Sequence, residues 1–181
     1  SYSDEEWRER TLAALRLAVE RRMVADVPVG VLLSGGLDSS FVVALLAESG
    51  QTGLQTFSIG FEDAGGESGN EFVYSDLIAD RFATDHHQIR IETRNMVPAV
   101  DAAIGAMSEP MVSHDCVAFY LLSEQVAKHV KVVQSGQGAD EVFAGYDWYP
   151  PLSETPRKDA LDAYRSVFFD RGHDALNDLL Q

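Results

Sequence analysis

The sequence predicts an α/β protein built on a doubly wound, mostly parallel sheet of about four strands flanked by helices. Short apolar runs alternate along the chain with longer segments of helical periodicity, which is the pattern of successive strand–helix units. Two of the apolar runs end abruptly in glycine-rich polar turns, at residues 34–40 and 135–141. The 181 residues, 45% of them hydrophobic, are enough for one such domain with its own core.

The first helix is predicted over residues 5–24, because apolar residues recur on one face and charged residues occupy the other. The apolar positions of this helix are Leu12, Leu15, Val19 and Met23. Residues 29–33 form a short continuous apolar run, which suits a central parallel strand buried on both faces. After the glycine turn, a helix is predicted over residues 38–48, ending near Gly50.

The rest of the chain continues the alternation of strands and helices. Strands are predicted at 54–60, 86–91 and 130–134, and helices at 71–82, 95–107 and 116–129. The helix at 71–82 is expected to turn Phe72, Leu77, Ile78 and Phe82 to the core. Residues 147–151 are interpreted as irregular, and 157–181 as one or two short helices whose apolar residues need a partner. We therefore expect a core at 1–149 and a helical tail at 150–181.

Composition narrows the function class. A net charge of −15 argues against general nucleic-acid binding and against binding to an anionic membrane surface, although solubility or a saline habitat explains the charge equally well. Cys116 is the only cysteine, so neither a disulfide framework nor a cysteine zinc site is expected, and a reducing, cytoplasmic setting fits. No signal peptide or membrane-spanning run is recognised, and the Ser1 start indicates part of a longer protein.

The turn at residues 34–40 predicts a phosphate site, because the first backbone N–H groups of a helix are unpaired and carry partial positive charge. Gly35 and Gly36 let an anion approach the backbone closely. Hydroxyl donors come from Ser34, Ser39 and Ser40. The carboxylate of Asp38 repels phosphate, so it suggests a bridging Mg²⁺; the alternative is that Asp38 merely caps the helix.

The turn lacks the lysine of a Walker loop, and no dinucleotide fingerprint follows the first predicted strand. The sequence Ser-Gly-Gly-Leu-Asp-Ser at 34–39 instead resembles the pyrophosphate loop of the N-type ATP pyrophosphatases. The resemblance implies an adenine nucleotide alpha hydrolase-like fold. It also implies that ATP is cut between its α and β phosphates and that AMP is placed on an activated substrate.

The second turn narrows the resemblance. Residues 135–141, Ser-Gly-Gln-Gly-Ala-Asp-Glu, with Phe-Ala-Gly-Tyr at 143–146, are similar to the second glycine motif of asparagine synthetases. If the first and fourth strands are neighbours, the two turns face each other, and Asp38 and Asp140 could share Mg²⁺. The alternative for Asp140 and Glu141 is an ordinary acidic helix N-terminus. The resemblance also implies that the nucleotide is contacted by Leu32, Ile59, Ser135 and Gly136. For Leu32 and Ile59 the alternative is plain core packing.

One position departs from the family motif. Gln137 stands where asparagine synthetases have a glutamate, and a glutamine cannot act as a base at neutral pH. His114, Glu109 and Asp115 are candidate substitutes, although a lone loop histidine is more often structural. The sequence of residues 108–116, 135–140 and 146–151 is most similar to that of the N-acetylglutaminylglutamine amidotransferases of osmolyte synthesis.

The resemblance thus implies a glutamine-dependent amidotransferase in which MgATP adenylates a carboxylate and ammonia converts it to an amide. The implied acceptor is N-acetylglutaminylglutamine, with aspartate as an alternative, and the expected catalytic residues are Asp38, Asp140, Gln137 and His114. Ammonia would come from an N-terminal glutaminase domain that this chain lacks, and an oligomer is possible. A non-catalytic adenine-nucleotide binding module is the alternative of another class.

The other four histidines are interpreted as surface or structural residues: His86, His87, His129 and His173. The adjacent pair at 86 and 87 lies in a predicted strand, where successive side chains point to opposite faces. We therefore expect this pair to be a poor metal site.

Overall fold

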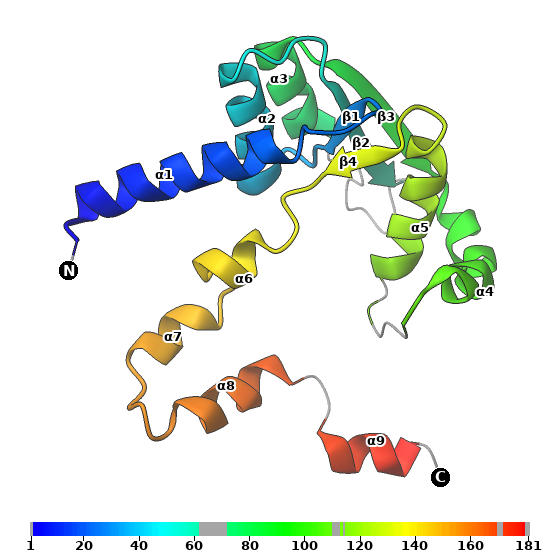
Figure 1. Cartoon of the computed structure of the whole chain (residues 1–181). Helices are drawn as coiled ribbons and strands as arrows, with labels where there is room; N and C mark the ends of the chain where they lie inside the picture. Colours follow the sequence, from blue (N-terminus) through cyan, green and yellow to red (C-terminus); the bar gives the residue numbers. More distant parts are fainter. Residues whose placement is uncertain (1, 62–71, 110–112, 114, 170–171, 180–181) are drawn as a thin grey trace. The chain divides into compact units, whose positions relative to one another are not determined.

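The computed structural model describes residues 2–61, 72–109, 113, 115–169 and 172–179. Contacts between residues divide the chain into two compact units, residues 1–136 and residues 137–181. In chain order, the first unit contains α1 (Asp4–Arg21), β1 (Val29–Leu32), α2 (Leu37–Glu48), β2 (Gln55–Phe61), α3 (Phe72–Phe82), β3 (Asp85–Ile91), a 3-10 turn (Thr93–Asn95), α4 (Met96–Ala106), α5 (Asp115–Val126) and β4 (Val132–Gln134) (Figure 1). The second contains α6 (Ala139–Phe143), α7 (Tyr149–Ser153), α8 (Ala160–Phe168) and α9 (His173–Leu179).

The described strands form one parallel sheet in the order β3-β2-β1-β4. In the register of the sheet, Val31 of β1 lies between Thr56 of β2 and Gln134 of β4. The chain moves outward from β1 to β2 and β3, and β4 then returns to the other side of β1. The predicted doubly wound parallel sheet is therefore confirmed, and the condition that the first and fourth strands are neighbours is met.

Helices cover both faces of the sheet, and each face has its own apolar core (Figure 1). On one face, Val31 and Leu33 pack against Val43 of α2 and Ala79 of α3. On the other face the buried residues come from β2, from α5 and from the connection between α5 and β4: Phe57, Leu122, Val126 and Val130. Helix α4 packs on α5 through a smaller cluster. A strand buried on both faces needs apolar residues at successive positions, which explains the continuous run at 29–33.

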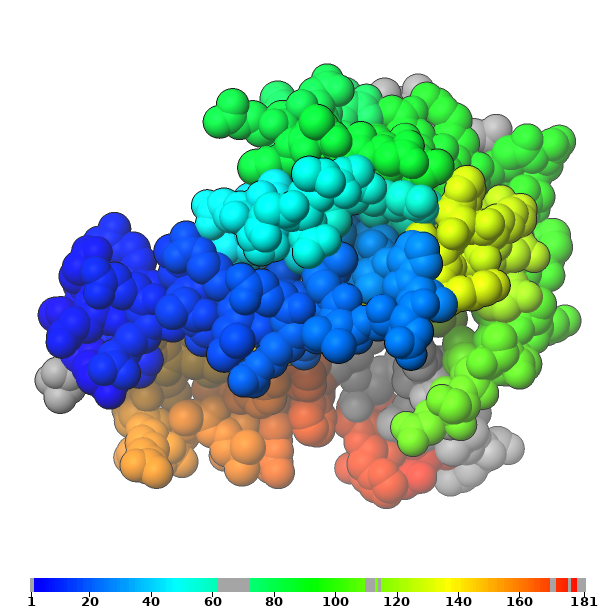
Figure 2. Space-filling view, turned by 45° about the horizontal axis from the view of Figure 1, so that its top comes forward, coloured from blue at the N-terminus to red at the C-terminus, as the bar shows by residue number. Residues whose placement is uncertain are grey.

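Helix α1 begins with a capping box, in which Ser3 accepts from the backbone N–H of Glu6 and the Glu6 carboxylate accepts from the backbone N–H of Ser3. Its predicted apolar face is confirmed, since Val19 is buried and Leu12, Leu15 and Met23 pack around it. An ion pair between Arg16 and Glu48 joins α1 to α2 at 2.9 Å. In Figure 2 the blue residues of α1 lie alongside the cyan residues near the end of α2.

Helix α3 buries Phe72 and packs Ile78 and Phe82 against the core as predicted, but it differs from the prediction at Leu77. Leu77 is 65% exposed, so its predicted place in the core is wrong. The fully buried stripe joins Phe72 to Ser75 and Ala79, at helical spacing. Because a polar residue occupies the middle of this stripe, the apolar pattern alone shifts the expected face toward Leu77.

The second unit contains short helices joined through aromatic contacts. Residues 147–151 were expected to be irregular, but α7 begins at Tyr149, and two prolines lie in its first turn, where a missing N–H costs no hydrogen bond. The rings of Tyr164 and Phe168 stack at a centroid separation of 4.8 Å, and those of Tyr146 and Trp148 at 4.3 Å. One or two short helices were predicted after residue 157, and the structure has two there, α8 and α9. Of the helices described in either unit, none has the length and apolar character that crossing a membrane requires.

Candidate functional site

The glycine turn after β1 lies where the strand order of the sheet reverses. Since β2 and β4 flank β1 on opposite sides, the turns that follow β1 and β4 are neighbours at the carboxyl edge of the sheet. Gly136 shows how close they are, because a Cβ atom on it would lie 2.9 Å from both the Cβ of Asp38 and the backbone N of Ser39. A ligand held at the first turn therefore lies beside the start of the second.

The first turn presents the N-terminus of α2 without a side-chain cap. Gly35 has a φ of +85°, in the left-handed region, and Gly36 is the N-cap residue with no side-chain hydrogen bond to the helix. Asp38 lies one position inside the first turn, so the alternative that it caps the helix is wrong. The first N–H groups of this 12-residue helix are thus available to an anion, as the sequence predicts.

Two of the predicted hydroxyl donors hold the turn itself. Ser39 Oγ accepts from the backbone N of Ser34 at 3.2 Å and lies 3.0 Å from Ser34 Oγ. Ser34 Oγ in turn accepts from the backbone N of Gly36 at 3.3 Å. Ser40 differs, because its hydroxyl oxygen is buried and has no hydrogen-bond partner among the described residues. A buried hydroxyl of this kind normally has a partner, so Ser40 fits the role of a phosphate donor.

Helix α3 fixes the other side of the turn. A Cβ atom on Gly35 would lie 2.5 Å from the Cβ of Tyr74 and 2.6 Å from the backbone N of Ser75. These distances are shorter than any real Cβ contact, so the backbone of α3 leaves room for glycine alone at this position. The left-handed φ of Gly35 adds a second reason for glycine.

Leu32 and Ile59, the predicted adenosine contacts, lie on the same face of the sheet. Both are half-buried and pack against the cluster that contains Phe57 and Leu122. The packing alternative is therefore confirmed for both side chains. Because neither side chain is fully buried, both can still contact a nucleotide, and that role stays a prediction.

The acidic part of the second turn lies in the second unit. Gly138 has a φ of +90° at the start of α6, and Asp140 and Glu141 follow in its first turn. The Asp140 carboxylate folds over the Cα of Gly145, where any side chain would clash with it. The Tyr146 hydroxyl donates to Glu141 Oε1 at 2.7 Å, and this hydrogen bond raises the pKa of Tyr146 to about 12.

The residues expected to handle the acceptor belong to different parts of the chain. Gln137 is the first residue of the second unit, and Ser135 is exposed at the end of the first. His114 lies outside the described residues. Glu109 is exposed, and Asp115 begins α5, where its carboxylate accepts from the hydroxyl of Ser113 at 3.0 Å. Their catalytic roles stay predictions.

A preformed metal cage is not part of the described structure. Within residues 2–61, 72–109, 113, 115–169 and 172–179, no group of three or more His, Cys, Asp or Glu side chains could hold a metal ion. Mg²⁺ does not require such a cage, because it commonly binds one or two carboxylates together with substrate phosphates and water. The half-buried Asp38, in the first turn of α2, fits that mode of binding.

Sequence reasoning missed a polar layer behind the first turn. Ser75 and Thr56 are completely buried, Ser58 is 4% exposed, and His86 makes hydrogen bonds to both strand hydroxyls. It also missed Gln134, whose buried amide donates to the Val19 carbonyl of α1 at 3.1 Å. Isolated polar residues inside apolar runs were the available signal, but such residues are usually assigned to solvent-facing positions.

Comparison with known proteins places these features in a family. The family described as asparagine synthase matches residues 10–180. The provisionally named glutamine-hydrolyzing asparagine synthetase 2 of Methanocaldococcus jannaschii is 42% identical over 130 residues, covering 71% of this chain and 24% of that protein. Glutamine-hydrolyzing asparagine synthetase 1 of Bacillus subtilis is 34% identical over 140 residues, covering 77% of this chain and 22% of its own length.

Among solved structures, the NH3-dependent NAD synthetase of Campylobacter jejuni aligns with 12% identity and a TM-score of 0.49. The alignment covers 90% of this chain and 74% of that one. The chain spans about a quarter of the length of the curated relatives described above.

Proposed function

We propose that this chain, which belongs to the asparagine synthase family, forms the ATP-binding part of a synthetase that converts a carboxylate to an amide. The observation that carries the proposal is the first glycine turn. It combines a left-handed Gly35, the N-terminus of α2 without a side-chain cap, and the buried hydroxyl of Ser40 at a switch point of the sheet. These groups suit a pyrophosphate, which carries several negative charges and many acceptor oxygens.

In the proposed reaction, a carboxylate oxygen of the acceptor attacks the α-phosphorus of ATP, and the bond between that phosphorus and the bridging oxygen breaks. Pyrophosphate leaves with the electron pair, and an acyl-adenylate remains. The backbone N–H groups after Gly36 and the hydroxyl of Ser40 would stabilise the charge that grows on the leaving group. Ammonia then attacks the acyl carbon, AMP leaves, and one ammonia proton passes to a base.

Asp38 and Asp140 would hold Mg²⁺, which neutralises phosphate charge when it is bound. The proposal for Asp38 follows from its place in the first turn of α2, where a carboxylate without a cation would repel phosphate. The proposal for Asp140 follows from the family motif and from its ordered position over Gly145. Leu32, Ile59, Ser135 and Gly136 would complete the nucleotide site.

Ammonia is proposed to come from a glutaminase domain, because the similar proteins are named as glutamine-hydrolyzing. We propose N-acetylglutaminylglutamine as the acceptor, with aspartate as the second candidate. Gln137 favours the first, because it departs from the glutamate of asparagine synthetases. His114 and Gln137 would then contact the acceptor. A cytoplasmic setting is part of the same proposal.

Exchange of labelled pyrophosphate into ATP tests the proposal directly in the full-length protein. We expect exchange that depends on the acceptor carboxylate, with the dipeptide more effective than aspartate. If nucleotide binds but neither carboxylate supports exchange, the protein is a non-catalytic nucleotide-binding module. Exchange with aspartate alone would instead identify an asparagine synthase.

A variant of Asp38 tests the metal role. We expect Asp38→Asn to lower Mg²⁺-dependent exchange about a hundredfold, because charge on the leaving group loses its compensation. Asp26→Asn is a matched control, since Asp26 is exposed and lies before β1, at the opposite end of the strand from the glycine turn. Unchanged exchange in the Asp38 variant would contradict the role.

A further inference from the structure

We propose that His86 is a positioning residue for the first glycine turn, acting through Ser58 and Ser75 on the backbone of Gly35. The pyrophosphate part of its test rests on the proposed function, whereas the backbone part does not. His86, Ser58 and Ser75 form part of a polar layer between α3 and the strands β2 and β3, behind the turn. None of these residues belongs to the predicted site.

His86 is held inside this layer by both ring nitrogens. Its side chain is only 10% exposed, with Nδ1 lying 2.8 Å from Thr56 Oγ1 and Nε2 3.1 Å from Ser58 Oγ. The neighbouring His87 points to the opposite face, where its ring stacks on Phe57 at 4.9 Å. The expectation that the pair is a poor metal site therefore fits the strand geometry.

Ser58 connects the imidazole to α3. Ser75 Oγ shares its proton between Ser58 Oγ at 3.3 Å and the Phe72 carbonyl oxygen at 3.1 Å, and Ser58 and Ser75 are both buried, so water does not compete for these contacts. The backbone N of Ser75 lies 2.6 Å from the position that a Cβ on Gly35 would take. Any shift of α3 at Ser75 therefore acts directly on the Gly35 backbone, which already has a left-handed φ.

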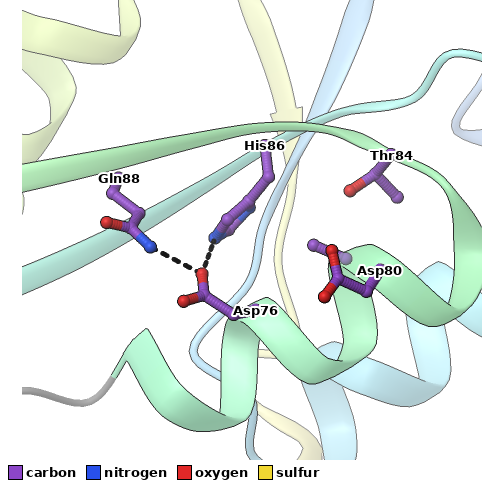
Figure 3. A pocket seen from close by; sticks show the side chains of 6 residues that line it. Asp76, Asp80, Thr84, His86 and Gln88 are labelled. Atoms are coloured by element: carbon purple, nitrogen blue, oxygen red, sulfur yellow. Dashed lines mark hydrogen bonds and ion pairs between the residues drawn. The ribbon is translucent and has the colours of Figure 1, made fainter.

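The ring faces a hollow of about 430 Å³ between α3 and β3, lined by Asp76, Ala79, Asp80, Thr84, His86 and Gln88 (Figure 3). Asp76 lies 3.6 Å from His86 Nε2 and accepts from the Gln88 amide at 2.6 Å. Figure 3 shows Asp76 pointing from α3 toward both side chains. Because the two ring nitrogens already have hydroxyl neighbours, we assign the ring to positioning and not to ligand binding.

The protonation state of His86 determines the direction of these hydrogen bonds. Burial lowers the pKa of His86, and the Asp76 carboxylate, the largest opposing influence, raises it; His87 lowers it and Asp80 raises it. A neutral imidazole has one donor and one acceptor nitrogen, so one hydroxyl must donate to the ring and the other must accept. A protonated ring donates from both nitrogens, which reverses one hydrogen bond of the layer.

Two substitutions of His86 distinguish the hydrogen bond of Nε2 from that of Nδ1. The amide of glutamine reaches the position of Nε2, whereas the amide of asparagine reaches only that of Nδ1. We expect His86→Gln to keep the link to Ser58 and His86→Asn to lose it. Amide hydrogen exchange of Ser34 and Gly36, which both donate within the turn, should accelerate about tenfold in the asparagine variant and little in the glutamine variant.

The same variants are compared for binding of magnesium pyrophosphate to the full-length protein. We expect the asparagine variant to bind about tenfold more weakly than the glutamine variant, in line with its exchange rates. His87→Asn is the matched control on the opposite face and should leave the turn amides unchanged. Ser58→Ala, a second break in the same path, should resemble His86→Asn, and combining the two should add little.

Equal exchange rates of the turn amides in His86→Gln and His86→Asn would overturn the inference, as would a His87→Asn effect of the same size. If wild-type protein binds no pyrophosphate while the turn amides still separate the two variants, the proposed function fails and the positioning role stands. All variants are measured where their unfolding curves show a fully folded protein, so that global unfolding does not contribute to exchange.

Discussion

Gly35 and Gly36 are adjacent and identical in sequence, but the structure constrains them differently. Gly35 has a positive φ and meets the backbone of α3, whereas Gly36 has a φ of −67° and only Ser34 Oγ near its missing Cβ, at 3.4 Å. We expect Gly35→Ala to lower the free energy of unfolding by about 3 kcal/mol, as the sum of left-handed strain and overpacking. Gly36→Ala should cost less than about 1 kcal/mol.

Urea unfolding monitored by circular dichroism measures both variants of the turn under identical conditions. If Gly35→Ala and Gly36→Ala lower the free energy of unfolding by similar amounts, contact with α3 does not determine the conformation of the turn. The comparison is internal, because both variants add the same methyl group at neighbouring positions.

Ala83 has a φ of +50° at the end of α3, a conformation in which an L-residue is strained. We expect Ala83→Gly to raise the free energy of unfolding by about 1 kcal/mol, because glycine adopts a left-handed conformation without the Cβ penalty. Ala14→Gly provides the opposite control, since Ala14 is exposed within α1 and glycine there costs about 1 kcal/mol. A loss of stability in Ala83→Gly would contradict the assigned conformation.

At the scale of elements, the contact of α3 with β3 carries a pH dependence through His86. Its lowered pKa means that the unfolded chain, with a histidine pKa of about 6.5, binds the proton first as pH falls. Stability from this group is therefore complete above about pH 6.5 and is lost as pH falls through the lower folded pKa. Urea unfolding from pH 7.5 to 5 should show this loss in wild type and less of it in His86→Gln.

Carboxylates also titrate toward the lower end of this range, so the difference between the two proteins is the quantity to measure. Identical pH profiles for wild type and His86→Gln would show that the ring is not held neutral by the fold. His87→Gln serves as the control, because it removes a histidine that faces the opposite side of the sheet.

Element types could be predicted because the strands are apolar runs and glycine turns mark the carboxyl ends of two of them. The pairing of β1 with β4 entered only as a condition for the two turns to face each other, and the structure supplies it. The place of Ser75 in the buried stripe of α3 could not be predicted, since it depends on a hydrogen bond to Ser58 that joins residues 17 apart. Hydrogen-bonded polar cores have no apolar periodicity to read.

Some parts of the candidate site could be predicted from the sequence, and others could not. Ser34, Gly35, Gly36 and Ser39 could be assigned to one turn because they are consecutive in sequence. The contact of Gly136 with Asp38 and Ser39 could be expected only from fold logic, since about a hundred residues separate the two turns. The close approach of Tyr74 to Gly35 could not be predicted, because Tyr74 lies on α3, which follows another strand and has no recognisable motif.

At the scale of the whole molecule, burial is distributed unequally along the chain. All described residues that are buried lie at or before Gln134, so the first unit contains the described core. In the second unit, Leu161 and Val167 are 59% and 52% exposed, and the stacked rings of Tyr164 and Phe168 are not fully buried. A segment with so little buried apolar surface gains little free energy from staying folded. Its local opening should therefore be easier than that of the sheet.

Limited proteolysis of this chain tests that difference. We expect trypsin to cut first at Arg157 or Lys158, which are exposed between α7 and α8, at least about tenfold faster than at sites within the first unit. Replacing both residues by glutamine should prolong the life of the intact chain, whereas Arg94→Gln should not, and mass spectrometry identifies each cut. First cleavage at Arg94 or Lys128 would contradict the prediction, because both lie among elements that pack on the sheet. The outcome follows from where apolar surface is buried, since a protease needs several residues of unfolded backbone and those residues open most easily where no core holds them.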